Sequence, residues 1–302
     1  MRIRKIKAIA AMCVLLSAPA GAAGDGKFII QSHRGAGELS TDNTMEAFEL
    51  GWEMGTYPEA DVRETKDGVL VAFHDKDFKR VVKDAGPELE GKGVKDLTYE
   101  ELSRLDVGSW KGKEHEGQRV PKLKDVFARM QGNPERHLYL DIKEVDLAKL
   151  AAEVTGMGIG GQVVLASTRY QIIRDWKKLV PDSDTLVWIG GTEEAQKKRI
   201  GELRDAGFEG VTQIQLHVRL PGDAKDLKDG EPFSPSRAFL KAAGEEFAGR
   251  GIVFQSLPWK ANTPEIYHQL MDLGVVSFAS DHPDVTLKAV RNHVPKAAAT
   301  PN

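Results

Sequence analysis

Apolar, β-rich runs recur along this chain with helix-like segments between them, and this alternation predicts a parallel sheet with helices outside it. Eight runs have strand character: 28–32, 57–62, 137–142, 162–166, 185–189, 210–214, 251–255 and 275–279. Eight parallel strands that close on themselves form a (β/α)₈ barrel, whose active site lies at the carboxyl ends of the strands. His33, Asp61 and Asp141 fall at or just past three of these ends, so we expect an α/β barrel with its site there.

Helix starts and one long insertion are predicted between the strands. Asn43 with Glu46 resembles a capping box that opens a helix, and Thr98 with Glu101 repeats the device. Residues 76–131 follow the second strand and its hairpin and are too long and too polar for an ordinary connection. We therefore expect an inserted excursion over the barrel mouth, with a short helix beginning at Thr98.

A hairpin is predicted directly after the second strand. Asp67-Gly68 is a favoured two-residue turn, and a strand-like apolar run follows it. If these two residues form the loop, Asp61 lies opposite His74, with Cβ atoms about 4.5–5.5 Å apart. Glu59 shares a strand face with Asp61 because side chains alternate with a period of two. We therefore expect these three polar groups to converge.

The N-terminus predicts a secretory signal peptide over residues 1–23. Four basic residues precede an apolar run over residues 8–16, and small residues follow, with cleavage expected near Ala20 or Ala23. The apolar run is too short to span a bilayer, which takes roughly 20 residues. We expect an exported, periplasmic or secreted protein without a stable membrane anchor, consisting of one domain over residues 24–295 and a disordered tail over 296–302. Its single cysteine, Cys13, lies within the leader, so the mature chain has no disulfide or thiolate chemistry.

The charge balance argues against a nucleic-acid partner. The formal net charge is −3, and loss of a leader with four basic residues and no acidic ones makes it about −7. Proteins that bind polyanions normally carry a net basic face. Anion recognition is therefore expected in one small pocket, with a small-molecule substrate.

The chemistry-bearing residues are concentrated between residues 28 and 75. His33 and His74 flank Glu59 and Asp61, and Arg34 follows the first histidine. An acid, a base, an anion-binding guanidinium and hard oxygen ligands are what metal-assisted cleavage of a phosphodiester requires. This segment therefore predicts phosphodiester chemistry.

Motifs along essentially the whole mature chain resemble the glycerophosphodiester phosphodiesterase family. They are His33-Arg34-Gly35, Asp42-Asn43-Thr44, Glu59-Ala60-Asp61-Val62, Thr65-Lys66-Asp67-Gly68, the segment 71–75, Val120-Pro121-Lys122-Leu123, Leu140-Asp141-Ile142-Lys143, Trp259-Lys260-Ala261-Asn262 and Ser280-Asp281-His282-Pro283. The resemblance implies a TIM barrel that hydrolyses glycerophosphodiesters to glycerol phosphate and an alcohol. It also implies one divalent cation, Ca²⁺ or Mg²⁺.

The resemblance implies a role for each matching residue. Glu59, Asp61 and Asp141 would hold the metal, His33 and His74 would be the acid/base pair, and Arg34 with Lys143 would bind the phosphate. These roles suit the chemistry, because carboxylate oxygens bind hard cations and a guanidinium can bind two phosphate oxygens. The implied mechanism is attack by the glycerol C2 hydroxyl, with His74 as base and His33 as acid, and a cyclic phosphate that water then opens. The order of the two histidines comes from the family analogy alone.

Two positions depart from the family, which normally has glutamate where this chain has Asp42 and Asp141. On an unchanged backbone, the shorter Asp141 would lie about 1 Å or more back from an ion whose ligand distances are about 2.0–2.6 Å. Asp42 either helps to cap a helix or, with Asn43, supports the metal ligands from outside.

The sequence also leads to expectations for Trp259 and His217, to which none of the roles above is assigned. Trp259, at the end of the seventh strand, either covers the glycerol with its ring face or packs the barrel rim. His217 lies in a segment that resembles a surface loop or helix, so we expect a structural or solvated histidine there.

Two alternative functions stay open at the level of sequence. The first is cleavage of lysolipids or lipid headgroups in the manner of phospholipase C or D, which requires an exposed apolar rim for acyl chains. The second is a non-catalytic barrel that binds cations or glycans, because a fold does not secure a function. The oligomeric state is not predicted.

Overall fold

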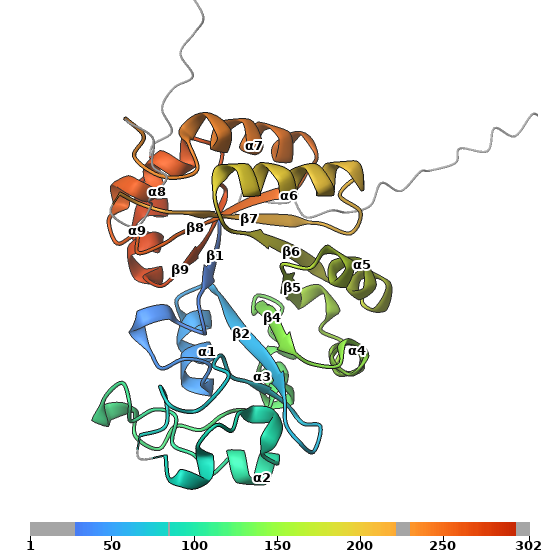
Figure 1. The fold of residues 1–302 in the computed structure, drawn as a ribbon, viewed down its shortest axis with the longest axis vertical. Helices are drawn as coiled ribbons and strands as arrows, with labels where there is room; N and C mark the ends of the chain where they lie inside the picture. The colour runs from blue at the N-terminus through green and yellow to red at the C-terminus, as the bar shows by residue number, and fades with distance from the viewer. Residues whose placement is uncertain (1–27, 84, 222–229, 294–302) are drawn as a thin grey trace, which may run out of the picture.

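Eight parallel strands close into a barrel in the computed structural model of this protein, which describes residues 28–83, 85–221 and 230–293 (Figure 1). The barrel strands are β1 (Ile29–Ser32), β2 (Tyr57–Glu64), β4 (Leu138–Glu144), β5 (Val163–Ser167), β6 (Asp184–Ile189), β7 (Gln213–Val218), β8 (Val253–Pro258) and β9 (Ser277–Ser280). Around the barrel the order is β1-β9-β8-β7-β6-β5-β4-β2, and a parallel pairing of β1 with β2 closes it. A further strand, β3 (Leu70–Ala72), pairs antiparallel with β2. The predicted α/β barrel is confirmed.

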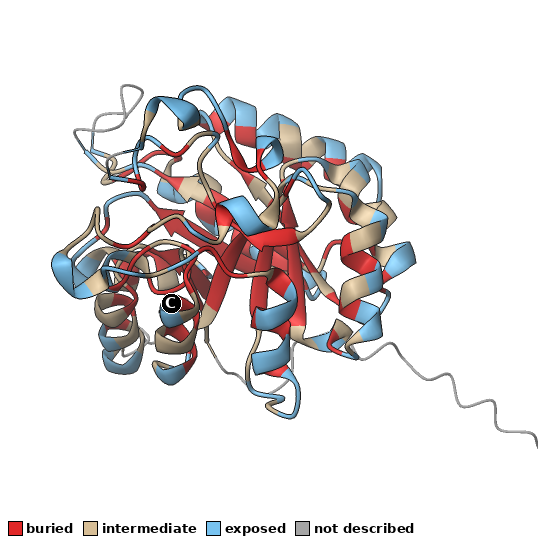
Figure 2. Cartoon of the chain, turned by 90° about the horizontal axis from the view of Figure 1, so that it is seen from below, coloured by how far each residue is buried: buried red, intermediate tan, exposed pale blue. Residues whose placement is uncertain are grey.

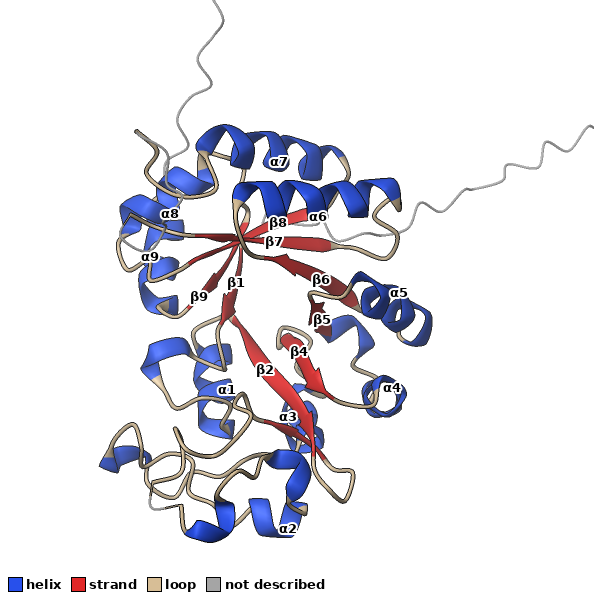
Figure 3. Ribbon diagram, in the orientation of Figure 1, coloured by secondary structure: helices blue, strands red, loops and turns tan. Residues whose placement is uncertain are grey.

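Helices cover the outside of the barrel and bury their apolar faces against the strands (Figures 2 and 3). They are α1 (Met45–Glu53), α3 (Leu123–Met130), α4 (Leu147–Gly156), α5 (Tyr170–Leu179), α6 (Glu193–Asp205), α7 (Arg237–Gly249), α8 (Pro264–Met271) and α9 (Pro283–Asn292). A short helix, α2 (Tyr99–Leu102), lies instead in the segment that follows β3. Short 3₁₀ turns span Gly37–Leu39, Pro87–Leu89, Val94–Asp96, Lys113–His115 and Gly160–Gln162. Trp176 on α5 and Phe247 on α7 are fully buried in the main core between helices and strands.

The predicted signal peptide and C-terminal tail lie outside the described residues. Within the described ranges, the structure contains no helix whose length and hydrophobicity would allow it to cross a membrane.

Three of the later strands begin two or three residues after their predicted starts. Gly210, Gly251 and Gly274 each adopt a positive φ, between +69° and +94°, just before β7, β8 and β9. Such angles belong to turns and helix ends rather than to strands, so two of the predicted runs began on a turn residue and the third began directly after one. As a consequence, His217 lies within β7 and not in a surface loop, which corrects the expectation for this residue.

The hairpin after β2 has a different register from the predicted one. Val62 pairs with Ala72 and Glu64 with Leu70, so the loop has three residues, and Gly68 closes it with a φ of +80°. Phe73, not His74, lies opposite Asp61, because the Phe73 amide donates to the Asp61 carbonyl at 2.7 Å. The predicted cross-strand contact is therefore wrong, since a three-residue loop shifts every pair by one position.

The excursion after β3 has its own hydrophobic cluster and is shorter than predicted. Residues of the segment 78–120, including Phe78, Leu102 and Val120, pack together with Val71 and Phe73. Helix α3, which the prediction included in the insertion, instead belongs to the main core. The excursion lies beside β2 and β3, at the end of the molecule away from α6 and α7 (Figure 1).

Helix α1 begins one residue later than its predicted capping box. Thr44 is the N-cap, and its hydroxyl accepts a hydrogen bond from the Ala47 amide at 3.3 Å. Asn43 has a φ of +55°, outside the N-cap conformation, and its side chain points to Asp61. The capping box of Thr98 and Glu101 is confirmed at the start of α2.

We expect Thr44→Ala to lower the free energy of unfolding by at least about 1 kcal/mol, because it removes a cap from a buried helix start. Chemical denaturation measures the change. Thr263→Ala is the matched control, because Thr263 caps α8 without a side-chain hydrogen bond and is exposed. Equal losses in the two variants would contradict the assignment of the cap.

Candidate active site

Three carboxylates from two neighbouring strands meet at the carboxyl end of the barrel. Glu59 and Asp61 lie two residues apart on β2, so they share one face of the strand. The parallel register pairs Asp61 with Asp141 on β4. Each of the three offers an oxygen within 4.8 Å of the others, and Glu59 and Asp61 are buried. The structure thus brings together the carboxylates that the resemblance assigns to a metal.

The Lys143 ammonium lies among these carboxylates. Its Nζ is 2.6 Å from Asp141 Oδ2 and 2.9 Å from Asp61 Oδ1. Burial raises the pKa of Asp61, but the opposing effects, of which the positive charge of Lys143 is the largest, leave that pKa lowered. Burial also raises the pKa of Asp141, and it raises the pKa of Glu59 to about 7 against the opposing effect of His33. One ammonium therefore keeps Asp61 ionised but does not offset the burial of all three groups.

The cluster fits a hard divalent cation. Asp61 Oδ1 is buried and, despite its closeness to Lys143, has no donor with hydrogen-bond geometry among the described residues. Carboxylate oxygens are the ligands that Ca²⁺ and Mg²⁺ prefer. Separations of up to 4.8 Å lie within twice a Ca²⁺–oxygen distance of about 2.3–2.6 Å. Glu59, Asp61 and the shorter Asp141 could therefore hold one such ion.

His33 follows β1 and is held between two carboxylates. Its Nδ1 lies 2.6 Å from Asp281 Oδ1, and its Nε2 lies 3.7 Å from Glu59 Oε2. Burial of the ring lowers its pKa, but Glu59 and Asp281 together outweigh burial and raise the pKa to about 9. The imidazole is therefore protonated at neutral pH and carries a proton on Nε2, the atom that faces Glu59.

His74 has the opposite hydrogen-bonding arrangement. Arg34 Nη2 lies 3.0 Å from His74 Nε2, and a guanidinium can only donate. Nε2 must therefore be the acceptor, which leaves the proton on Nδ1, and Nδ1 donates to Asp75 Oδ1 at 2.6 Å. In this tautomer His74 is neutral and presents a lone pair where His33 presents a proton.

A closed ring of side chains supports His74 and Arg34. Arg34 Nη1 donates to Asp42 Oδ2 at 2.8 Å, and Arg80 Nη2 donates to the same oxygen at 2.7 Å. Arg80 Nε donates to Asp75 Oδ2 at 2.7 Å, and Asp75 accepts from His74. Asp42 therefore does not cap a helix. It links Arg34 to the excursion that carries Arg80.

Asn43 supports the carboxylate cluster directly. Its Nδ2 donates to Asp61 Oδ2 at 2.8 Å, and its Oδ1 accepts from the Asp61 amide at 2.9 Å. The backbone on either side is tightly constrained, because Asn43 and Arg34 both have a positive φ and the Asn43 amide donates to the Arg34 carbonyl at 2.8 Å. Positive φ costs energy in residues other than glycine and clusters at functional sites. The pair of hydrogen bonds fixes the orientation of the Asp61 carboxylate.

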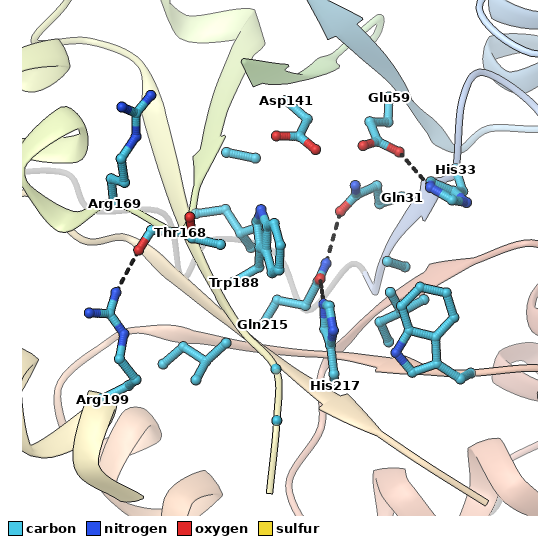
Figure 4. Close-up of a pocket in the computed structure, with 18 of the residues that line it drawn as sticks. Gln31, His33, Glu59, Asp141, Thr168, Arg169, Trp188, Arg199, Gln215 and His217 are labelled. Atoms are coloured by element: carbon cyan, nitrogen blue, oxygen red, sulfur yellow. Dashed lines mark hydrogen bonds and ion pairs between the residues drawn. The ribbon is translucent and has the colours of Figure 1, made fainter. Parts of the chain in front are cut away.

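These groups open into a pocket of about 900 Å³ at the barrel mouth (Figure 4). His33, Arg34, Glu59, His74, Asp141 and Lys143 line one side of it. Trp188, His217 and Trp259 line the same pocket as a group of adjoining rings, and Trp259 also lines a small hollow together with His33 and Arg34. His217 stacks on Trp188 with ring centroids 5.1 Å apart, and Trp259 meets His217 edge-on at 5.5 Å. No described residue of the excursion lines this pocket, so the expectation that the excursion covers the mouth is wrong.

Sequence reasoning missed several residues of the site. Asp75 and Asp281 lie within the quoted motifs, so their position beside the histidines was a usable signal. His217 was missed because the start of β7 was predicted too early. Arg80 gave no signal, because one arginine in a polar excursion resembles any solvated residue.

Comparison with known proteins identifies relatives over nearly the whole described chain. Residues 33–206 match the glycerophosphoryl diester phosphodiesterase family. A glycerophosphodiester phosphodiesterase of Caldanaerobacter subterraneus subsp. tengcongensis is 32% identical over 276 residues, covering 88% of this chain and 98% of that protein. A human lysophospholipase D is 27% identical over 278 residues, covering 83% of this chain and 82% of that protein.

A solved structure supports the fold independently of sequence. An Oleispira antarctica phosphodiesterase in complex with the product sn-glycerol-3-phosphate is similar to this chain with a TM-score of 0.62 and 20% identity. The similarity covers 87% of this chain and 97% of the other. At this identity the likeness concerns the fold alone.

The acid–base state of His33 is testable in chelator-treated protein. Because its folded-state pKa of about 9 exceeds the ordinary 6.5, protonated His33 stabilises the fold fully below about pH 6.5. That contribution is lost as the pH rises through about 9. NMR titration of the imidazole should therefore give a transition near pH 9, and Asp281→Asn should move it downward. Asp272→Asn, next to the distant His293, should leave it in place, and a wild-type transition at or below 6.5 would refute the assignment.

The ring predicts that Arg80 positions the site although it does not line the pocket. Arg80→Ala removes charge-assisted hydrogen bonds to Asp42 and Asp75, and we expect kcat to fall about tenfold, which corresponds to about 1.4 kcal/mol. The Arg80 side chain is 37% exposed, so added guanidinium ion should restore part of kcat, which loss of fold would not allow. Arg104→Ala is the control in the same excursion, because Arg104 pairs with exposed Glu100. An unchanged kcat in Arg80→Ala would disprove the role.

Proposed function

The chain belongs to the glycerophosphoryl diester phosphodiesterase family and is a phosphoric diester hydrolase, and on this premise we propose that it cleaves glycerophosphodiesters to glycerol phosphate and an alcohol through a cyclic phosphate. One observation carries the proposal: His33 and His74 line one pocket with opposite protonation at Nε2. General acid–base catalysis needs one group that gives a proton and one that takes a proton at the same pH.

The phosphate would bind between the two histidines. Arg34 Nε is buried without a hydrogen-bond partner among the described residues, and a buried donor of this kind favours an anion that can accept from it. The Lys143 ammonium adds a second positive charge beside the carboxylates. When Arg34 turns its donors to the phosphate, Nε2 of His74 is released from its hydrogen bond.

In the first step His74 Nε2 takes the proton of the glycerol C2 hydroxyl, whose oxygen forms a bond to phosphorus. The bond from phosphorus to the alcohol oxygen breaks, and His33 Nε2 gives its proton to the departing alcohol. In the second step neutral His33 takes a proton from water, and the water oxygen attacks the cyclic phosphate. His74 then returns a proton to the C2 oxygen as the ring opens.

A divalent cation held by Glu59, Asp61 and Asp141 would supply Lewis-acid stabilisation of negative charge on the phosphoryl oxygens. Asn43 orients Asp61 toward this cluster through its two hydrogen bonds. The family suggests Ca²⁺ or Mg²⁺, and Trp259, which lines a hollow together with His33 and Arg34, would cover the glycerol.

Export belongs to the same proposal. The basic and apolar N-terminal segment supports removal of a leader near Ala20 or Ala23. Mass measurement of the protein recovered outside the cytoplasm should give a chain that lacks this segment, and an intact N-terminus would contradict it.

A panel of glycerophosphodiesters tests the reaction. Glycerol phosphate should be released in the presence of Ca²⁺ or Mg²⁺, lost with excess chelator and restored by the ion. His33→Ala and His74→Ala should each lower kcat by 10² or more while circular dichroism shows the native fold, whereas His293→Ala should have no effect on kcat. Equal losses in all three variants would mean that the assay follows folding, and no release from any member of the panel would refute the proposal.

Metal binding has a readout independent of turnover. Ca²⁺ at 100 times its Kd should stabilise the fold by about 2.7 kcal/mol, seen as a rise in Tm. Glu59→Gln should abolish that rise, and Glu90→Gln, at an exposed position in the excursion, should retain it.

A lysolipid as the only good substrate would favour the phospholipase alternative, in line with the name of the human relative.

A further inference from the structure

Three arginines lie around the half of the barrel mouth that is formed by the residues after β5, β6 and β7. This half carries none of the proposed catalytic groups. Arg169 follows β5, and Arg199 lies on α6 directly after β6. Both line the large pocket. Arg219 follows β7 and lines an adjoining hollow of about 260 Å³ that shares Gly191, His217 and Trp259 with that pocket. The arginines therefore surround one continuous part of the mouth.

This basic half faces the reaction centre across the barrel. His33 follows β1, and β6 lies four strands from β1 around the ring in either direction. Figure 4 shows Arg169 and Arg199 on the opposite side of the pocket from His33 and Glu59. A ligand held at His33 must therefore extend across the mouth to reach the arginines.

The charge of these arginines is only partly balanced. Arg199 donates to Glu202 Oε2 at 2.8 Å and to the Thr168 carbonyl at 2.5 Å. Among the described residues, no carboxylate forms an ion pair with Arg169 or Arg219, and both are exposed. Unbalanced positive charge at a concave opening attracts anions. The chain as a whole carries a net negative charge, so positive charge concentrated at this pocket indicates a place where an anion binds.

The surface between the two ends is aromatic and uncharged. Burial, with help from Arg219, lowers the pKa of His217 to about 4, so this ring adds no positive charge at neutral pH. His217 stacks on Trp188 and meets Trp259 edge-on, and these rings give an apolar surface suited to the carbon chain of a polyol. A volume of about 900 Å³ is near the upper end for small-molecule sites. This is more room than a glycerol phosphate with a small alcohol requires.

We propose that the basic half is a second anion subsite, and that the preferred leaving alcohol carries a phosphate group of its own. This inference rests on the proposed function and adds the substrate class to it. The reacting phosphate lies by Arg34, the carbon linker crosses the aromatic surface, and the second phosphate binds Arg169 and its neighbours. Phosphate fits because a guanidinium donates two parallel hydrogen bonds to its oxygens.

The test compares two diesters that differ in one group. In the first the leaving alcohol is glycerol, and in the second it is glycerol phosphate. We expect kcat/KM to be about tenfold higher for the second diester than for the first, a difference of about 1.4 kcal/mol. Added salt should reduce this difference, because it screens the charges of the exposed arginines. Arg169→Gln combined with Arg219→Gln should bring the ratio of the two kcat/KM values close to one.

Controls separate this inference from the proposed function. Arg250→Gln, on the outer end of α7 where Arg250 pairs with Glu246, should keep the wild-type ratio. If neither diester is cleaved, the proposed function fails. Two outcomes would refute the anion subsite but not the proposed function. In one, the wild type cleaves both diesters with equal kcat/KM. In the other, the double variant keeps the preference of the wild type for the second diester. A diester whose leaving alcohol is glycerate carries a carboxylate in place of the second phosphate. If its kcat/KM rises as much as that of the phosphate-bearing diester, the arginines attract anions in general and the assignment of a phosphate subsite is wrong.

Discussion

The burial of three carboxylates at one end of the barrel is the constraint on which the rest of the site depends. An unpaired buried charge is costly, and removal of one partner from a buried pair typically costs 3–5 kcal/mol. Lys143 and His33 supply the compensating charge, and Asn43 supplies hydrogen bonds. Side chains of the same pocket therefore make the fold tolerate its acidic centre, and the three carboxylates could hold a cation as a further partner.

The excursion contributes to this centre from outside the pocket. It has a hydrophobic cluster that holds it against β3, and it brings Arg80 to the two aspartates beside His74 and Arg34. Two arginines, two aspartates and His74 form this ring, and each contacts two neighbours, so a rotation of any one side chain breaks hydrogen bonds to charged groups. The excursion therefore supports His74 and Arg34 from outside, and its described residues do not line the pocket.

The two halves of the mouth have different chemistry because the barrel has different residues at successive strand ends. The three carboxylates, His33 and His74 lie on or just after β1 to β4, whereas β5 to β7 lead into the arginines, Trp188 and His217. Closure of the barrel turns this order along the chain into two facing walls. In the function proposed above, the reacting phosphate of a diester lies on one side of the mouth and its alcohol is selected on the other.

The sequence by itself determined the eight strands, the acidic cluster and the family, because hydrophobic period and local motif order are properties of neighbouring residues. The sequence determined less about positions that depend on a single turn residue. The hairpin register, the N-cap of α1 at Thr44 and the start of β7 each differ from the predicted positions by one to three residues. Only the tertiary structure decided that Arg80 reaches Asp42 and Asp75, that Asp281 reaches His33, and that His217 stacks on Trp188. The physical reason is that these contacts join segments distant in the chain, and barrel closure with exact strand lengths sets which side chains meet.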